Sequence, residues 1–291
     1  MHKHPALDAS PSALSGAGWL RYASPALFYP LAGRLIPWLA LTAALLACAG
    51  LYVGLAVAPT DSQQGEVYRI LFIHVAAAWM SMFLYLVMAL YAALGLIFHT
   101  RLSFMMMRAL APTGALFTFL TLWTGALWGK PTWGTWWVWD ARLTSELILL
   151  FLYLGFMALQ SASDDTQRAD RGGAILLLAG VINVPIIYFS VQWWNTLHQG
   201  ASINLTSAPS MANIMVTAML LMVAAFWLYS AAAALARGSV ARLCQGDDRG
   251  AGGRQAPGQR RRRPHPDRRG RIGLHRDRSN GRPGDAARPR P

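Results

Sequence analysis

The chain has 291 residues, of which 54% are hydrophobic and only 13% are charged. Soluble globular domains carry about 25% charged residues, so this composition excludes an ordinary soluble domain and indicates a chain that lies largely in lipid. The two cysteines, Cys48 in an apolar run and Cys244 in a polar tail, and the lack of a C-x-x-C-H run argue against a disulfide-stapled protein and against a c-type cytochrome.

The net charge of +13 belongs mostly to the end of the chain. Residues 241–291 hold 15 Arg and 5 Asp, whereas the preceding residues hold 11 Lys or Arg and 8 acidic residues. The basic end has no aromatic residue for stacking on bases and no recognisable fold, so no nucleic-acid partner is expected.

In chain order, residues 1–34 come first and have no continuous apolar run beside a basic start, so we expect a cytoplasmic N-terminal segment without a cleavable signal peptide. A membrane-spanning helix needs roughly 20 apolar residues. Six segments meet this requirement, and the second and sixth are long enough to tilt or to extend beyond the bilayer. They are 35–57, 68–98, 109–128, 143–160, 173–190 and 210–236. The expected fold class is therefore all-α, a polytopic membrane protein with six transmembrane helices, in which 35–236 form the membrane domain.

The distribution of cations predicts the orientation of these helices, because cytoplasmic loops are enriched in Lys and Arg. Eight cations fall on the side of the connections 99–108 and 161–172, and three fall on the other side. We therefore predict that both termini are cytoplasmic and that the loops 58–67, 129–142 and 191–209 face outward. In a bacterium with two membranes, this corresponds to a multi-pass protein of the inner membrane whose outward loops face the periplasm.

Residues 237–291 differ from the rest of the chain. From about residue 241, Gly, Pro, Arg and Asp dominate and apolar residues nearly vanish, so this segment is not expected to bury enough surface to fold. It is either a disordered basic tail attracted to anionic lipid headgroups or the out-of-frame translation of a GC-rich gene. We favour the second interpretation, and we assign the tail no function.

The most informative stretch is the outward tryptophan-rich loop, residues 128–142. Five of the twelve tryptophans of the chain lie within twelve residues: Trp128, Trp133, Trp136, Trp137 and Trp139. If 133–140 is helical, the spacing places three of these indoles and Asp140 on one face, as an amphipathic shelf that Pro131 and Gly134 introduce with a bend. Tryptophan is also enriched at any membrane boundary, so an anchoring belt is the alternative. Five indoles beside the charged pair Asp140-x-Arg142 favour a platform for a large planar apolar ligand.

The run Trp133-Gly134-Thr135-Trp136-Trp137-Val138-Trp139-Asp140-Ala141-Arg142-Leu143-Thr144-Ser145 resembles the tryptophan-rich "WWD" signature of haem-handling proteins. Its continuation after Asp140, on a chain with six helices, resembles in particular the cytochrome c maturation protein C family (CcmC, haem exporter protein C). The resemblance covers about residues 35–236 and includes the run Trp193-Trp194-Asn195-Thr196-Leu197-His198-Gln199-Gly200.

This resemblance implies a function in c-type cytochrome biogenesis. It implies that the chain binds haem b transiently and without a covalent bond at the periplasmic face, and that it hands haem to a periplasmic haem chaperone (CcmE-type). It also implies association with ABC-type ATPase and permease subunits (CcmA- and CcmB-type) and with a small single-span protein (CcmD-type).

Two of the seven histidines are candidates for haem ligation. His74 lies about 9 Å inside the second span, at ~1.5 Å rise per residue from Tyr68, and His198 lies in an outward loop. An ionisable group within a span is costly and is a functional candidate, although a histidine hydrogen-bonded within the bundle is the alternative. Haem iron accepts two axial ligands and neutral imidazole suits it, and the resemblance implies this role for both residues. The remaining histidines are best explained as solvated residues.

The two haem propionates need cationic partners, and Arg69, Lys130 and Arg142 are the outward cations before the tail. Arg69 and Arg142 are the candidates, but Arg142 is also spaced to form an ion pair with Glu146 at i, i+4. We expect Asp140 to orient a neighbouring N–H group or cation rather than to contact iron. Gln192 and Asn195 are candidates for additional polar contacts.

Three functions are compatible with these features. The first is a haem-binding and handover subunit that is not an enzyme, since no nucleotide-binding motif is present. The second is a permease, for which Pro112 and Pro185 are candidate helix breaks; the scarcity of ionisable residues within the spans argues against it. The third is a scaffold that its tryptophans merely anchor. We favour the first.

Overall fold

The computed structural model describes residues 25–194, 196–198 and 211–252, which contain helices and no strand. The expectations for residues 1–24 and for residues 253–291 of the predicted tail 237–291 fall outside these described residues and stay predictions. The first part of that tail is helical, because the last helix continues to Gly252. The chain divides into two compact units, Met1–Asp248 and Arg249–Pro291. The helices that surround the site belong to the first unit.

Two short non-α helices accompany the seven α-helices of the described chain. The helices are α1 (Pro25–Tyr52), the π-helical turn η2 (Val53–Val57), the 3-10 helix η3 (Glu66–Ile70), α2 (Leu71–Phe98), α3 (Arg101–Trp133), α4 (Ala141–Ser161), α5 (Thr166–Gly180), α6 (Asn183–Trp193) and α7 (Asn213–Gly252). Six stretches of the described residues are long and apolar enough to cross a membrane, with α5 and α6 forming one of them. The prediction of an all-α polytopic membrane protein with six spans is therefore confirmed.

Helix α3 is longer at both ends than its predicted apolar segment, and a glycine cap sets where it ends. Gly134 adopts a left-handed conformation (φ 76°), and its amide donates to the carbonyl of Lys130, which ends α3. After an irregular stretch, Asp140 caps α4 by accepting a hydrogen bond from the amide of Leu143 at 2.8 Å. The condition for the predicted shelf, a helix over 133–140, is therefore not met, since only Trp133 is helical there and residues 134–140 connect two helices.

Proline has different effects in two of the helices. Pro185 has no N–H group, and its ring would clash with the carbonyl of Val181, four residues earlier. The fifth span accordingly breaks at Val181–Ile182, between α5 and α6. Pro112 lies within α3, which stays continuous.

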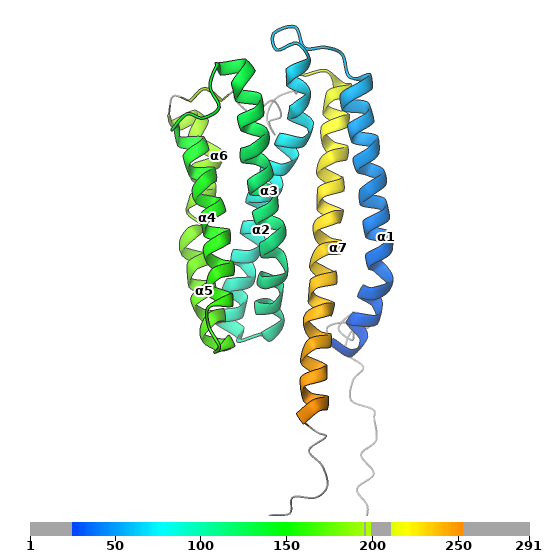
Figure 1. Ribbon diagram of the computed structural model, residues 1–291, viewed down its shortest axis with the longest axis vertical. Helices are drawn as coiled ribbons and strands as arrows, with labels where there is room; N and C mark the ends of the chain where they lie inside the picture. The colour runs from blue at the N-terminus through cyan, green and yellow to red at the C-terminus, as the bar shows by residue number, and fades with distance from the viewer. Residues whose placement is uncertain (1–24, 195, 199–210, 253–291) are drawn as a thin grey trace, which may run out of the picture. The chain divides into compact units, whose positions relative to one another are not determined.

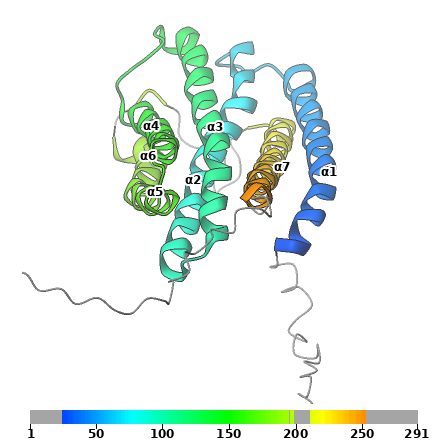
Figure 2. The same ribbon diagram turned by 60° about the horizontal axis from the view of Figure 1, so that its bottom comes forward.

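Helices α2 and α3 pack against each other, and α4, α5 and α6 cover one side of this pair (Figure 1). The second view agrees, and it shows α1 and α7 next to each other on the other side (Figure 2). The larger core cluster takes residues from each of the helices α2 to α6. It includes Tyr85 on α2 and Tyr153 and Phe156 on α4, which are fully buried. A smaller cluster, which includes Phe72 and Met219, joins the first turns of α2 to the first turns of α7.

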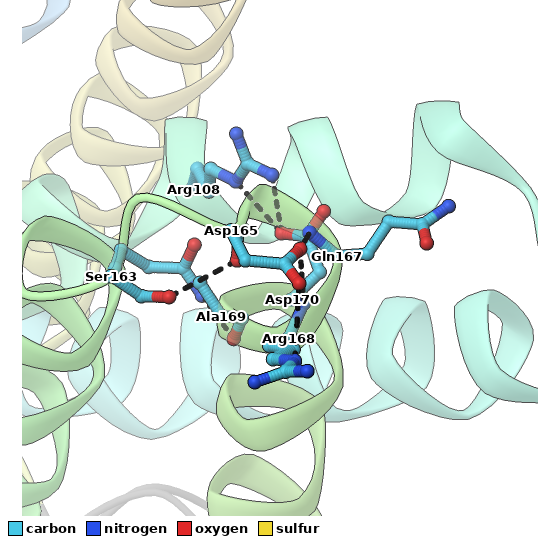
Figure 3. A network of polar contacts seen from close by, with 8 residues as sticks. Arg108, Ser163, Asp165, Gln167, Arg168, Ala169 and Asp170 are labelled. Atoms are coloured by element: carbon cyan, nitrogen blue, oxygen red, sulfur yellow. Dashed lines mark hydrogen bonds and ion pairs between the residues drawn. The ribbon is translucent and has the colours of Figure 1, made fainter. Parts of the chain in front are cut away.

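A polar network ties α3 to α5 at the end opposite to the tryptophan-rich loop (Figure 3). Arg108 on α3 donates from Nε to Oδ1 of Asp170 on α5 at 2.9 Å, and its Nη2 atom pairs with the same oxygen. Asp165 caps α5 by accepting from the amides of Gln167 and Arg168. Six crossings bring the start of α1 and the end of the sixth span to this same side, which the charge distribution predicts to be cytoplasmic.

Candidate functional site

The halves of α2, α3, α4 and α6 nearer the tryptophan-rich loop surround a cavity that encloses about 390 Å³ of empty space, counting the part open to solvent. Both histidines singled out from the sequence line it, although they lie 124 positions apart. The lining residues are His74, Ala78, Met82, Thr121, Leu122, Gly125, Arg142, Leu143, Glu146, Ile187 and His198. The cavity therefore brings together a residue inside a span and a residue of the loop that follows α6.

His74 lies in the first turn of α2 and contacts α3. Its Nδ1 atom is 3.0 Å from Oγ1 of Thr124, and that hydroxyl donates its proton to the carbonyl of Leu120 at 2.6 Å. Because a carbonyl only accepts, the hydroxyl must accept from His74, which assigns the proton to Nδ1. The lone pair is then on Nε2, the form in which a neutral imidazole binds a metal.

His198 is held by a carboxylate in a corresponding way. Its Nδ1 atom lies 3.2 Å from Oδ2 of the buried Asp140, whose other oxygen caps α4. Burial, and then the Arg142 cation, lower the pKa of His198 below its usual value of 6.5, although Asp140 acts in the opposite direction. The imidazole is therefore neutral at pH 7 with its proton toward Asp140, and this leaves Nε2 as its ligand atom.

Each of these histidines also packs against one indole. The ring of Trp128 meets that of His74 edge-on, with centroids 5.6 Å apart, and the ring of Trp133 meets that of His198 edge-on at 4.8 Å. Trp128 is held in turn by its Nε1–H group, which donates to Oε1 of Gln64 at 2.8 Å. These two tryptophans therefore support the two imidazoles.

The other three tryptophans of the loop do not share a helical face with Trp133, as a shelf would require. Trp136 and Trp139 are 55% and 75% exposed. Trp137 meets Trp139 edge-on at 5.3 Å, and its buried Nε1–H group has no hydrogen-bond acceptor within the described part of the chain. The loop thus offers an exposed aromatic surface next to the cavity.

The candidate cations differ in their surroundings. Arg142 lines the cavity, and its guanidinium makes no hydrogen bond or ion pair with a residue of the described ranges, although its backbone carbonyl accepts from Ser145 at 3.1 Å. Arg69 is bound to Glu66 and to the carbonyl of Gly54 at 2.7 Å, and it is not a lining residue. Lys130 donates to the carbonyl of Gly134 at 3.1 Å.

Glu146 does not form the ion pair that its spacing from Arg142 allows. It is buried, and its Oε1 atom lies 2.9 Å from Oγ of Ser81 on α2. Of the other candidates, Gln192 is exposed and does not line the cavity, and Asn195 lies outside the described residues.

Sequence reasoning missed Thr124 and Gly125, and it named Glu146 as a partner of Arg142 rather than of Ser81. Nothing in their local pattern distinguishes Thr124 from Thr118 or Thr121, which also bond to the carbonyl four residues earlier. The position of Glu146 could have indicated a site residue, since a carboxyl group within a predicted span is a functional candidate.

Comparison with known proteins shows the family of the chain. Residues 18–247 match the protein family described as "CcmC: Heme exporter protein C". The chain is 52% identical over 180 residues to "Heme exporter protein C" of Escherichia coli (strain K12), which covers 62% of this chain and 74% of that protein. It is 49% identical over 209 residues to the protein of the same name from Haemophilus influenzae, which covers 72% of this chain and 85% of that protein. It is also 51% identical over 159 residues to the "Putative cytochrome c biosynthesis ccmC-like mitochondrial protein" of Marchantia polymorpha, which covers 55% of this chain and 67% of that protein. The chain therefore belongs to the haem exporter protein C family.

Proposed function

We propose that this chain binds haem at the outer face of a bacterial inner membrane and hands it to a second protein in c-type cytochrome biogenesis. The observation that carries the proposal is that His74 and His198 line one cavity, each with its Nδ1 atom held by an oxygen. Metal-ligating histidines usually donate their other ring N–H group to such an oxygen, which orients the ring and raises its basicity. The names of the relatives, which refer to haem export and cytochrome c biosynthesis, support the same function.

In this proposal haem b is cargo, held without a covalent bond by two axial imidazoles. Arg142 is the propionate partner, because it is the outward arginine in the cavity and has no ion pair with the described residues. Trp128 and Trp133 each hold one of the two imidazoles by an edge-on ring contact. The chain binds and orients its cargo and carries out no covalent step on it.

Handover requires that the cargo be reachable by a partner. The exposed Trp136 and Trp139 lie on the short loop that ends at Asp140, and Asp140 is the residue that holds His198. We propose that a periplasmic haem chaperone (CcmE-type) docks on this aromatic loop. Loss of the contact between Asp140 and His198 would remove the acceptor that orients this imidazole and would weaken its hold on haem at that moment. Membership of the family supports association with CcmA-, CcmB- and CcmD-type subunits, and any energy input comes from the ATPase.

The test is the visible spectrum of the purified full chain after expression with ample haem. We expect a Soret band in the wild type that is strongly reduced in His74→Ala and in His198→Ala. His99→Asn is the matched control, because His99 is outside the cavity and adopts a left-handed conformation (φ 52°) that Asn tolerates. A colourless wild type, or bands of equal intensity in all three variants, would contradict the proposal.

A further inference from the structure

The ring of His74 packs against one neighbouring helix, α3. Thr124, Gly125 and Trp128 lie within five positions of α3, and each contacts this ring. The hydroxyl of Thr124 meets Nδ1, and the edge of Trp128 packs against the ring. An imidazole at the entrance of α2 is therefore oriented by its neighbour α3 rather than by its own helix.

Gly125 allows the ring of His74 to lie close to α3. A Cβ atom at this position would lie 3.0 Å from Cε1 of His74 and 3.6 Å from Nδ1. The first distance is shorter than an ordinary carbon–carbon contact of about 3.5–4.0 Å. Any larger residue would push the ring away from α3, and with it the Nδ1 atom that contacts Thr124.

Thr124 belongs to a row of three threonines on α3 that make the same type of hydrogen bond to the backbone. Thr118, Thr121 and Thr124 each donate to the carbonyl four residues earlier, at 2.8, 2.8 and 2.6 Å. This bond uses the single hydroxyl proton, so the oxygen can only accept a further hydrogen bond. Of these three threonines, Thr124 is the one whose hydroxyl contacts a histidine of the described chain.

From this geometry we propose that Thr124 is a positioning residue that fixes the Nδ1–H tautomer of His74 and so presents Nε2 to the haem iron. The inference rests on the proposed function, because it concerns how one of the two axial ligands is prepared. It parallels the role of Asp140 toward His198, with a neutral acceptor inside the span and a charged acceptor outside it.

Loss of the hydroxyl has two unfavourable outcomes for the ring. If the proton stays on Nδ1, it loses its side-chain acceptor and keeps at most the backbone carbonyl of Thr121, so the ring is held less firmly. If the proton moves to Nε2, the lone pair no longer faces the iron. Either outcome weakens ligation, and removal of such an acceptor typically lowers metal affinity about 10-fold to 100-fold.

The experiment compares Thr124→Val with Thr118→Val in the full-length protein. Both changes remove a buried hydroxyl and the same type of backbone bond, but Thr118 does not contact His74. Haem affinity is measured by titration with hemin in detergent, and the ligand field of the ferric form by electron paramagnetic resonance. Thr124→Ser restores the hydroxyl, and Thr124→Ala provides a second, smaller substitution if the valine variant does not accumulate.

We expect Thr124→Val and Thr124→Ala to bind hemin about 10-fold to 100-fold more weakly with an altered low-spin signal. We expect Thr124→Ser and Thr118→Val to resemble the wild type. Wild-type affinity and signal in Thr124→Val, or equal losses in the two valine variants, would overturn the inference while leaving haem binding intact. If His74→Ala also binds hemin as the wild type does, the ligand assignment itself fails, and the inference fails with it.

Discussion

Asp140 connects the start of α4 to His198, a residue 58 positions further along the chain. One oxygen of its carboxylate accepts from the amide of Leu143 at 2.8 Å, and the other lies 3.2 Å from Nδ1 of His198. The same side chain therefore ends the tryptophan-rich loop and orients a proposed iron ligand. Any movement of the loop changes both contacts together.

Replacing Asp140 should separate these two functions. Asn is as good an N-cap as Asp but has no charge, so Asp140→Asn should keep the helix start and weaken haem binding moderately. Asp140→Ala should lose both contacts, with about 1 kcal/mol less stability from the lost cap and about 10-fold weaker haem binding. The measurements are thermal unfolding in detergent and hemin titration.

Asp165→Ala is the matched control, because Asp165 caps α5 in the same way at the other end of the bundle. It should lower stability by a similar amount and leave haem affinity unchanged. Equal haem affinities for Asp140→Ala and Asp165→Ala would show that the carboxylate of Asp140 is only a cap.

Arg142→Gln should weaken haem binding by removing the cation that the proposal assigns to a propionate. A hydrogen bond to a charged group contributes about 1.5–3 kcal/mol, which corresponds to roughly 10-fold or more in affinity. Arg69→Gln is the control, because Arg69 is bound to Glu66 and to the carbonyl of Gly54.

Esterification of both haem propionates should weaken binding to the wild type and have little further effect on binding to Arg142→Gln. An ester effect of equal size in both proteins would exclude Arg142 as the partner.

Trp137→Ala should reduce transfer of haem to the periplasmic chaperone more than it reduces the amount of protein in membranes. The indole packs against Trp139 in the aromatic loop, and its buried N–H group has no acceptor among the described residues. Transfer is measured as haem bound by the chaperone, normalised to the membrane level of the chain. Trp38→Ala is the control, because this tryptophan is 69% exposed on α1, far from the loop along the chain. A loss of transfer that only follows the loss of protein would show that Trp137 has a structural role.

Gly114→Ala should destabilise the bundle itself. A Cβ atom there would lie 2.2 Å from the ring of Tyr153, a fully buried side chain whose hydroxyl donates to the carbonyl of Ser81. Overpacking of this kind costs about 1–3 kcal/mol. Gly155→Ala is the control, because its nearest neighbour, a methyl group of Leu176, would be at an ordinary 3.7 Å. We expect a lower unfolding temperature in detergent for the first variant only, and equal temperatures would contradict the close packing of α3 on α4.

The capping residues show how the sequence can mislead. The spacing of Trp133, Trp136, Trp137 and Asp140 predicted one helical face, but Gly134 ends α3 and Asp140 starts α4. Both signals were present in the sequence, because glycine is common just after a helix and aspartate just before one. Periodicity over eight residues was the weaker indicator, since capping groups decide where the backbone leaves the helix.

The sequence by itself determined the six spans, the all-helical class and the residues that carry the family signature. Hydropathy and motif spacing are local properties of the chain, and a span needs only enough consecutive apolar residues to replace water by lipid. The orientation of the termini stays a prediction from the distribution of cations.

Only the tertiary structure decided which atoms meet. The contacts of His74 with Thr124 and of His198 with Asp140 join residues 50 and 58 positions apart, so they depend on how helices pack and not on any local pattern. The same packing directs Arg142 into the cavity and binds Arg69 elsewhere, although both are outward arginines in the sequence. A ring nitrogen acquires its protonation state from the acceptor beside it, and that acceptor exists only once the helices have come together.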